Sequence, residues 1–198
     1  MIDFDKVKIR DLFSRLFVIA VMYKINLDSF TYMLERSHFV ILLEKNRYND
    51  YFNNSIEKIF NEITNFNISN ERSYGVYNDA YWCGQNYFDL HERINKSFSY
   101  IFLKLPFSKM IDLYPVYHEM DFSSLVEYFI EKEKNKTILR LLCENKKCSL
   151  NDVSKGTLIS FNTLLKYNSS DDALYNGSFQ TISKIAKFFD VQYDLFIK

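Results

Sequence analysis

The sequence predicts an all-α protein, and three observations support that prediction. The 198 residues include only 4 Gly and 2 Pro, whereas strand-rich folds place many of these residues in their turns. Hydrophobic residues make up 47% of the chain and charged residues 25%, which is typical of a chain that folds around a core. Apolar residues also recur at helical spacing, as in the segment from Phe179 to Phe189.

The two halves of the chain differ in charge. Residues 1–131 contain 14 Lys and Arg against 18 Asp and Glu, and residues 132–198 contain 11 against 7. This asymmetry predicts an acidic helical region at 1–131 that binds a partner or forms a dimer, followed by a basic domain at 132–198. The charged run E-K-E-K-N-K-T at 131–137 is interpreted as a domain boundary within the first turns of a helix.

The acidic region contains a candidate tandem repeat. The segments K-I-N-L-D-S-F-T-Y-M-L (Lys24–Leu34) and R-I-N-K-S-F-S-Y-I-F-L (Arg93–Leu103) share a basic-Ile-Asn start and a Ser-Phe-(Ser/Thr)-Tyr frame. They predict two copies of a three- or four-helix unit at 1–65 and 76–131. Chance similarity in an aromatic-rich chain is the alternative. The helix candidates upstream of the two segments are Arg10–Tyr23 and Asp79–His91.

The repeat makes specific structural predictions. Ser29 and Ser97 would each cap a helix, because serine is a preferred N-cap residue. Phe30 and Phe98 would then fill equivalent core positions, and Tyr32 would be equivalent to Tyr100.

Three serines predict helix starts in the basic domain. An apolar stripe begins at Ile138 and ends near Lys147, after which Ser149 caps a helix with Asp152 in a capping-box position. Ser160 and Ser178 cap two further helices. A long turn ending at Asn176-Gly177 is expected between them, and a last short helix is expected over Val191–Ile197.

These five helices resemble the phage-repressor-like (Xre-type) helix-turn-helix domain. The family pattern is matched by Ser149, Val153, Ile159-Ser160, Thr163-Leu164 and Tyr167 at the family spacing, without a gap. Three features depart from the family. Leu158 replaces the small residue of the turn, Leu150 replaces a Gln that often contacts phosphate, and Asp171-Asp172 follow the recognition helix. The acidic region is also weakly similar to small helical domains encoded beside bacterial toxin genes.

The resemblance implies a sequence-specific DNA-binding transcriptional regulator that acts as a repressor. The recognition helix of this family enters the major groove by its N-terminal end. Asn can bind adenine and apolar side chains can contact thymine methyl groups, so we expect an A·T-containing, palindromic operator bound by a homodimer. The expected base-contacting residues are Phe161, Asn162, Leu165 and Lys166. The expected phosphate-contacting residues are Lys146, Lys147, Ser149, Lys155, Ser160, Gly177 and Ser178.

A second hypothesis is an antitoxin- or inhibitor-type protein. Region 1–131 would then neutralise a partner protein, and the helix-turn-helix domain would repress the protein's own gene. The apolar outer positions Phe161 and Leu165 also suit a helix-turn-helix domain that binds protein in place of DNA.

The sequence contains no recognisable catalytic, metal or cofactor motif. His118-Glu119 lacks the second histidine of a zinc site, and His118 is expected to end a helix before one over Phe122–Lys132. Gly84, beside Trp82 and Cys83, is expected to allow close helix packing. We therefore expect a protein that is not an enzyme.

The sequence also carries a prediction about location. The start M-I-D-F-D-K is acidic, unlike a signal peptide, and the apolar run Leu16–Tyr23 is shorter than the roughly 20 residues that span a bilayer. Three cysteines do not make a disulfide framework. These features predict a cytoplasmic protein that does not associate with membranes.

Overall fold

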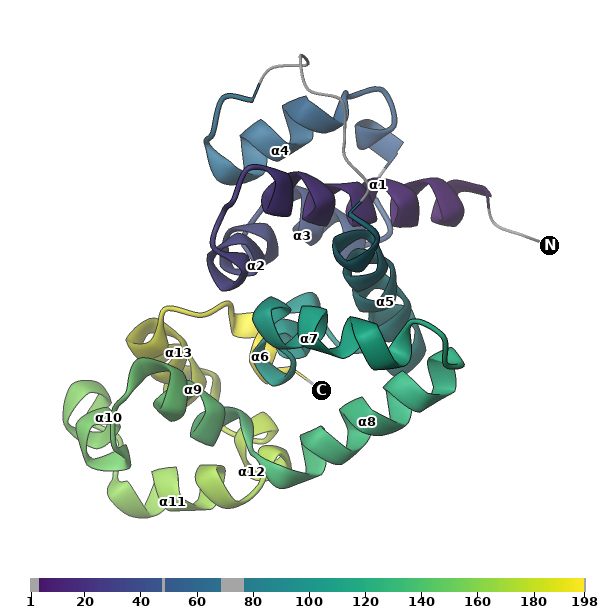
Figure 1. The fold of residues 1–198 in the computed structure, drawn as a ribbon. Helices are drawn as coiled ribbons and strands as arrows, with labels where there is room; N and C mark the ends of the chain where they lie inside the picture. The colour runs from purple at the N-terminus through teal and green to yellow at the C-terminus, as the bar shows by residue number, and fades with distance from the viewer. Residues whose placement is uncertain (1–3, 48, 69–76, 198) are drawn as a thin grey trace. The chain divides into compact units, whose positions relative to one another are not determined.

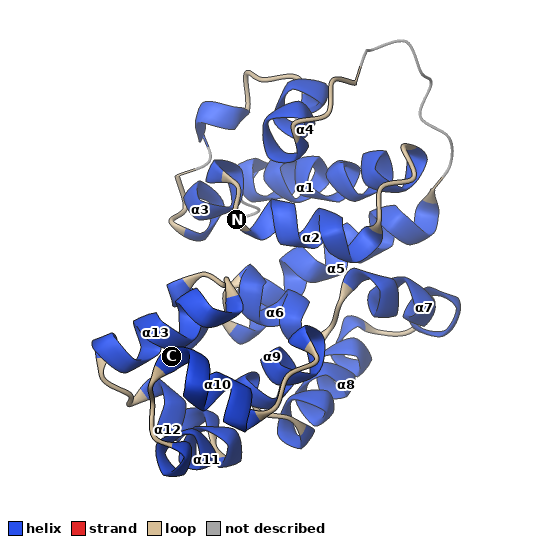
Figure 2. Cartoon of the chain, turned by 90° about the vertical axis from the view of Figure 1, so that its left-hand side faces the viewer, coloured by secondary structure: helices blue, strands red, loops and turns tan. Residues whose placement is uncertain are grey.

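The computed structural model describes residues 4–47, 49–68 and 77–197, and the regular elements in these segments are all helices (Figures 1 and 2). The predicted all-α class is therefore confirmed. The chain divides into two compact units, Met1–Ser124 and Leu125–Lys198, called unit 1 and unit 2 below.

The division between the units differs from the predicted boundary. Residue 131 lies inside helix α8 (Phe122–Asn135), which begins where the sequence predicted but continues beyond Lys132. The charged part of the run at 131–137 therefore ends α8, and its last residue, Thr137, is the N-cap of the next helix. With the observed division, unit 2 has 11 Lys and Arg against 9 Asp and Glu, and unit 1 has 14 against 16. The charge asymmetry is half of that expected.

Unit 1 is organised around the crossing of α1 (Phe4–Met22) and α5 (Asn78–Ile94). At the crossing, a Cβ atom added to Gly84 would lie 2.5 Å from the Cα atom of Ser14. Such a distance is a steric clash, so the absence of a side chain at Gly84 sets the separation of the two helices. The expectation that Gly84 allows close packing is confirmed.

The core of unit 1 is built largely from phenylalanine. The rings of Phe13 and Phe98 are 4.8 Å apart between centroids, and the ring of Phe17 lies 5.2 Å from that of Phe30 and 4.9 Å from that of Phe107. All five side chains are fully buried. The remaining helices of the unit are α2 (Leu27–Glu35), α3 (His38–Glu44), η1 (Asn49–Tyr51), α4 (Ile56–Thr64), α6 (Phe98–Lys104) and α7 (Phe107–Tyr117).

The two predicted repeat copies are joined by polar contacts as well as by the core. The carboxylate of Asp28 in α2 accepts hydrogen bonds from the main-chain N–H (2.9 Å) and the hydroxyl (2.8 Å) of Ser108, at the start of α7. The carboxylate of Glu44 in α3 accepts one from the N–H of Phe98 (2.7 Å), at the start of α6. Side chains from the first predicted copy thus accept hydrogen bonds from main-chain N–H groups at two helix starts in the second copy.

The local geometry of the repeat motif differs between the two segments. Phe30 and Phe98 are both buried, and Ser97 caps α6 as predicted. The N-cap of α2, however, is Asn26, so the predicted cap at Ser29 is wrong.

The predicted equivalence of the two tyrosines is also wrong, because Tyr32 is 46% exposed and Tyr100 only 1%. The start of the second predicted copy, residue 76, lies outside the described residues. The residues shared by the two segments occupy different helical positions, since Phe30 is the fourth residue of α2 and Phe98 the first of α6. The local geometry does not support the repeat.

Unit 2 contains five α-helices after α8. The caps at Ser149, Ser160 and Ser178 are present as predicted, and Ser149 forms a capping box with Asp152. One prediction needs correction, because a short helix occupies part of the expected turn. The expected last short helix is present as a four-residue 3-10 helix. The elements are α9 (Ile138–Lys146), α10 (Leu150–Thr157), α11 (Phe161–Ser169), α12 (Asp171–Tyr175), α13 (Phe179–Phe189) and η2 (Tyr193–Phe196).

Helix α10 packs on α13 at a second glycine. A Cβ atom added to Gly156 would lie 2.3 Å from the Cε2 atom of Phe188. The apolar residues Val153, Leu164 and Ile182 of unit 2 are fully or almost fully buried. These contacts hold α10 and α13 together and leave the outer face of α11 uncovered.

Candidate nucleic-acid interface

Helices α10 and α11 are joined by a three-residue turn, Leu158–Ser160. Leu158 adopts the left-handed conformation (φ 58°, ψ 28°), and its N–H donates to the carbonyl of Ser154. Its side chain is 84% exposed. Glycine usually occupies such a position, because a side chain with a Cβ atom is strained there.

One face of α11 is exposed and the opposite face is buried. Leu164 and Tyr167 point into the core. The four residues predicted to contact bases are all exposed, namely Phe161, Asn162, Leu165 and Lys166. The helical period therefore places the predicted set on one surface, next to the exposed side chain of Leu158.

The start of α11 is repeated at the start of α13. Ser160 accepts a hydrogen bond from the N–H of Thr163, and the two hydroxyls lie 2.8 Å apart. Ser178 and Thr181 make the same pair of contacts, again with 2.8 Å between the hydroxyls. The sequence signals for this are S-F-N-T at 160–163 and S-F-Q-T at 178–181, which were not among the predicted features. The first residue of α13, Phe179, is 71% exposed.

The N-terminus of α10 is occupied by a carboxylate. The N–H and the hydroxyl of Ser149 both donate to the Oδ2 atom of Asp152, at 2.9 and 2.6 Å. These hydrogen bonds lower the pKa of the Asp152 carboxyl, which stays ionised at neutral pH. Ser149 was predicted to contact phosphate, but in this structure both of its donors are directed to Asp152.

Lys146 contacts the end of α13. Its ammonium group donates to the carbonyl of Phe188 and lies 4.3 Å from the centroid of the Phe188 ring. A cation beside the last carbonyls of a helix is electrostatically favourable. The structure thus gives Lys146 a partner within unit 2. Lys147 after α9, Lys155 in α10 and Lys166 in α11 are exposed.

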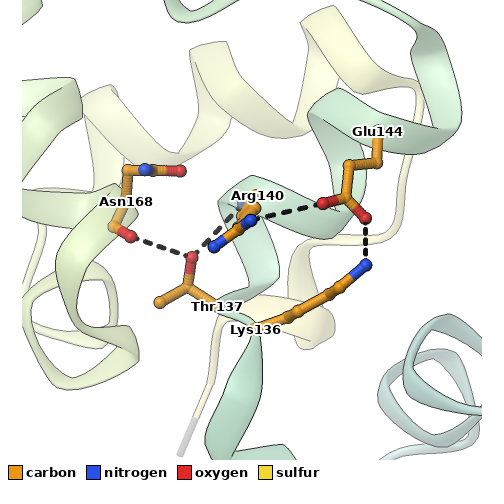
Figure 3. Close-up of polar contacts among 5 residues, drawn as sticks. All are labelled: Lys136, Thr137, Arg140, Glu144 and Asn168. Atoms are coloured by element: carbon orange, nitrogen blue, oxygen red, sulfur yellow. Dashed lines mark hydrogen bonds and ion pairs between the residues drawn. The ribbon is translucent and has the colours of Figure 1, made fainter.

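The acidic residue Asp171, which follows α11, has a structural role. The carboxylate of Asp171 accepts a hydrogen bond from the N–H of Ile138 at 2.7 Å. Beside it, the hydroxyl of Thr137 donates to the carbonyl of Asn168 at 3.1 Å (Figure 3). The ends of α9, α11 and α12 therefore meet at one polar junction.

Figure 3 also shows the ion pairs of Glu144 in α9 with Lys136 and Arg140. Glu144 accepts hydrogen bonds from Lys136 (2.5 Å) and Arg140 (3.3 Å). The hydrogen bond from Lys136 lowers the pKa of the Glu144 carboxyl. Two of the cations that made region 132–198 basic are thus paired with the same anion.

Gly177 is constrained by packing. A Cβ atom at this position would lie 2.8 Å from Ile182 and 2.9 Å from the hydroxyl of Tyr167. The neighbouring Ser178 is exposed. Its hydroxyl caps α13, at whose N-terminus Gly177 and Ser178 were predicted to contact phosphate.

No family model, curated protein or solved structure gives a significant match to this chain. Among the described residues, His, Cys, Asp and Glu side chains form no group of three or more that could hold a metal ion. None of the described helices has the length and apolar character needed to cross a membrane.

Proposed function

We propose that the chain is a sequence-specific DNA-binding transcriptional regulator that acts as a repressor, with α11 as its recognition helix. The observation that carries the proposal is the exposed face of α11. This face follows a three-residue turn and combines an amide, a cation and two apolar side chains. These groups suit the edges of A·T base pairs in the major groove.

Each group has a distinct role in this proposal. The amide of Asn162 binds the N6 and N7 atoms of adenine, and Phe161 and Leu165 contact thymine methyl groups. Lys166 meets a backbone phosphate or a base at the edge of the site. A homodimer would place two such helices on a palindromic operator.

Phosphate binding rests on fewer residues than the sequence suggested. Ser149 and Lys146 have partners within unit 2, and the N–H of Gly177 donates to the carbonyl of Leu174 at 2.9 Å. The hydroxyls of Ser160 and Ser178 cap their own helices. Lys147, Lys155 and the main-chain N–H groups at the starts of α11 and α13 therefore remain. Because each phosphate contact steepens the fall of affinity with salt, we expect a shallow salt dependence for this protein.

The test is selection of duplexes from a random pool, followed by titration of the selected site. Asn162→Ala should reduce the affinity for that site by about 1–3 kcal/mol and abolish the preference for one adenine. Gln180→Ala is the matched control, because Gln180 is also an exposed amide, follows Ser-Phe and occupies the second position of its helix. Failure to select any duplex, or equal loss of base preference in both variants, would overturn the proposal.

A second candidate is an antitoxin- or inhibitor-type protein that binds a partner protein through unit 1. The observation that favours it is an open pocket of about 390 Å³ between α1 and the segment after η1. The pocket has apolar walls and two cations, and the Arg15 guanidinium is paired with the carboxylate of Asp11 at 2.9 Å. An acidic, partly apolar segment of a partner would bind Lys8 and compete with Asp11 for Arg15. The pocket is lined by Lys8, Asp11, Leu12, Arg15, Phe52, Asn54 and Ile56.

This candidate is tested by coexpression with the product of the adjacent gene. Lys8→Glu and Arg15→Glu should prevent a complex that the wild-type chain and Asn162→Ala both form. A complex that survives both charge reversals would exclude the pocket as the binding site, and the absence of any complex would count against this function.

A further inference from the structure

Two cysteines meet at the C-terminal end of α9. Lys147 adopts the left-handed conformation (φ 53°), and its N–H donates to the carbonyl of Glu144 at 3.2 Å. The N–H of Cys148 donates to the carbonyl of Cys143 at 3.0 Å. This pair of hydrogen bonds defines a Schellman motif, in which the side chains at the positions of Cys143 and Cys148 commonly contact each other.

The two thiols are neighbours and are both reduced. Each side chain is half-buried, and the Cys143 thiol forms a hydrogen bond with that of Cys148. Burial, reinforced by Cys148, raises the pKa of the Cys143 thiol to about 12. Cys143 is therefore protonated at neutral pH.

We propose that Cys143 and Cys148 form a modification site that a small-molecule disulfide converts to an intramolecular disulfide across the end of α9. One cysteine sulfur attacks the disulfide and releases one thiol, and the sulfur of the other cysteine then displaces the second. One S–S bond forms and one breaks. The two cysteine protons go to the two released thiols, so the cysteines are oxidised and the reagent is reduced.

The main chain is already arranged for this bond. A disulfide needs its two Cα atoms within about 7 Å, and the Cys148–Cys143 main-chain hydrogen bond brings the residues together before any reaction. The chain also contains an internal control. Cys83 in α5 is fully buried, and its burial raises the pKa of its thiol, so it should not react.

The experiment equilibrates the full-length protein with glutathione and glutathione disulfide and then maps its peptides by mass. We expect a peptide pair lighter by two hydrogen atoms that links Cys143 to Cys148, with Cys83 unmodified. The equilibrium constant for closure should exceed that of a synthetic peptide of residues 140–151 by about tenfold or more, because the folded chain holds the pair in place. An equal or smaller constant would show that the fold does not favour the bond.

Two variants make the result decisive. Cys83→Ser should close to the same extent, whereas Cys148→Ser should remain reduced or take up glutathione without closing. Stable glutathione adducts on the wild-type chain, with no linked peptide, would overturn the proposal. None of these readouts involves DNA, so the outcome is independent of the proposed regulatory function.

Discussion

The carboxylate of Asp171, at the start of α12, accepts a hydrogen bond from the main-chain N–H of Ile138, the first residue of α9. This contact explains why an acidic residue follows a helix proposed to lie on DNA. The first N–H groups of a helix lack partners within the helix. Asp171 supplies one from a segment that is 33 residues away in the sequence.

The first prediction concerns this contact. Asp171→Ala should lower the free energy of unfolding of unit 2 by about 1–2 kcal/mol, because it leaves the N–H of Ile138 without its carboxylate partner. Chemical unfolding followed by circular dichroism measures the change. Asp172→Ala serves as the neighbouring control and should cost less. Equal effects of the two substitutions would contradict a specific role for Asp171.

A second prediction concerns the turn before α11. Leu158→Gly should stabilise unit 2 by about 1 kcal/mol, because a left-handed conformation strains a residue with a Cβ atom while an 84% exposed side chain gains little from burial. Leu158→Ala keeps the strain and removes only the exposed atoms, so it should bring no gain. The idea fails if alanine stabilises the unit as much as glycine does.

A third prediction concerns the helix crossing of unit 1. Gly84→Ala should destabilise the unit by about 1–3 kcal/mol, since the new methyl group meets the main chain of Ser14. Gly156→Ala should cost less, because the Phe188 side chain can move and alanine favours a helix. The single tryptophan, Trp82, lies in α5, so its fluorescence follows unit 1 during unfolding.

A fourth prediction concerns pH. Burial lowers the pKa of His91 from its ordinary value of 6.5 in unit 1, where the ring stacks on Phe98 at 4.3 Å. As pH falls below 6.5, the unfolded chain binds a proton before the folded chain does. The neutral histidine's contribution is therefore complete above 6.5 and is lost as pH falls towards the folded-state pKa.

The free energy of unfolding of unit 1, followed by Trp82 fluorescence, should accordingly decrease as the pH is lowered through about 6.5. His91→Gln removes the titrating ring and should flatten this decrease, even if the variant is less stable throughout. An unchanged slope in the variant would assign the pH dependence to other groups.

Local sequence determined most of the helix starts in unit 2. Ser149, Ser160 and Ser178 each bond to a main-chain N–H three residues later, so the information for these caps lies within four consecutive residues. The exposed face of α11 follows for the same reason, because the helical period fixes which side chains share a surface. The predicted N-cap at Ser29 was wrong, because the nearby Asn26 is the N-cap residue of α2.

Tertiary structure alone decided the features that depend on distant residues. The partner of Asp171 is Ile138, and that of Lys146 is the carbonyl of Phe188, 42 residues away. The sequence treated Lys146 as a free cation, because net charge counts residues without their partners. Which donors remain available to a ligand depends on hydrogen bonds that form only when the helices pack, and no local pattern encodes those distances.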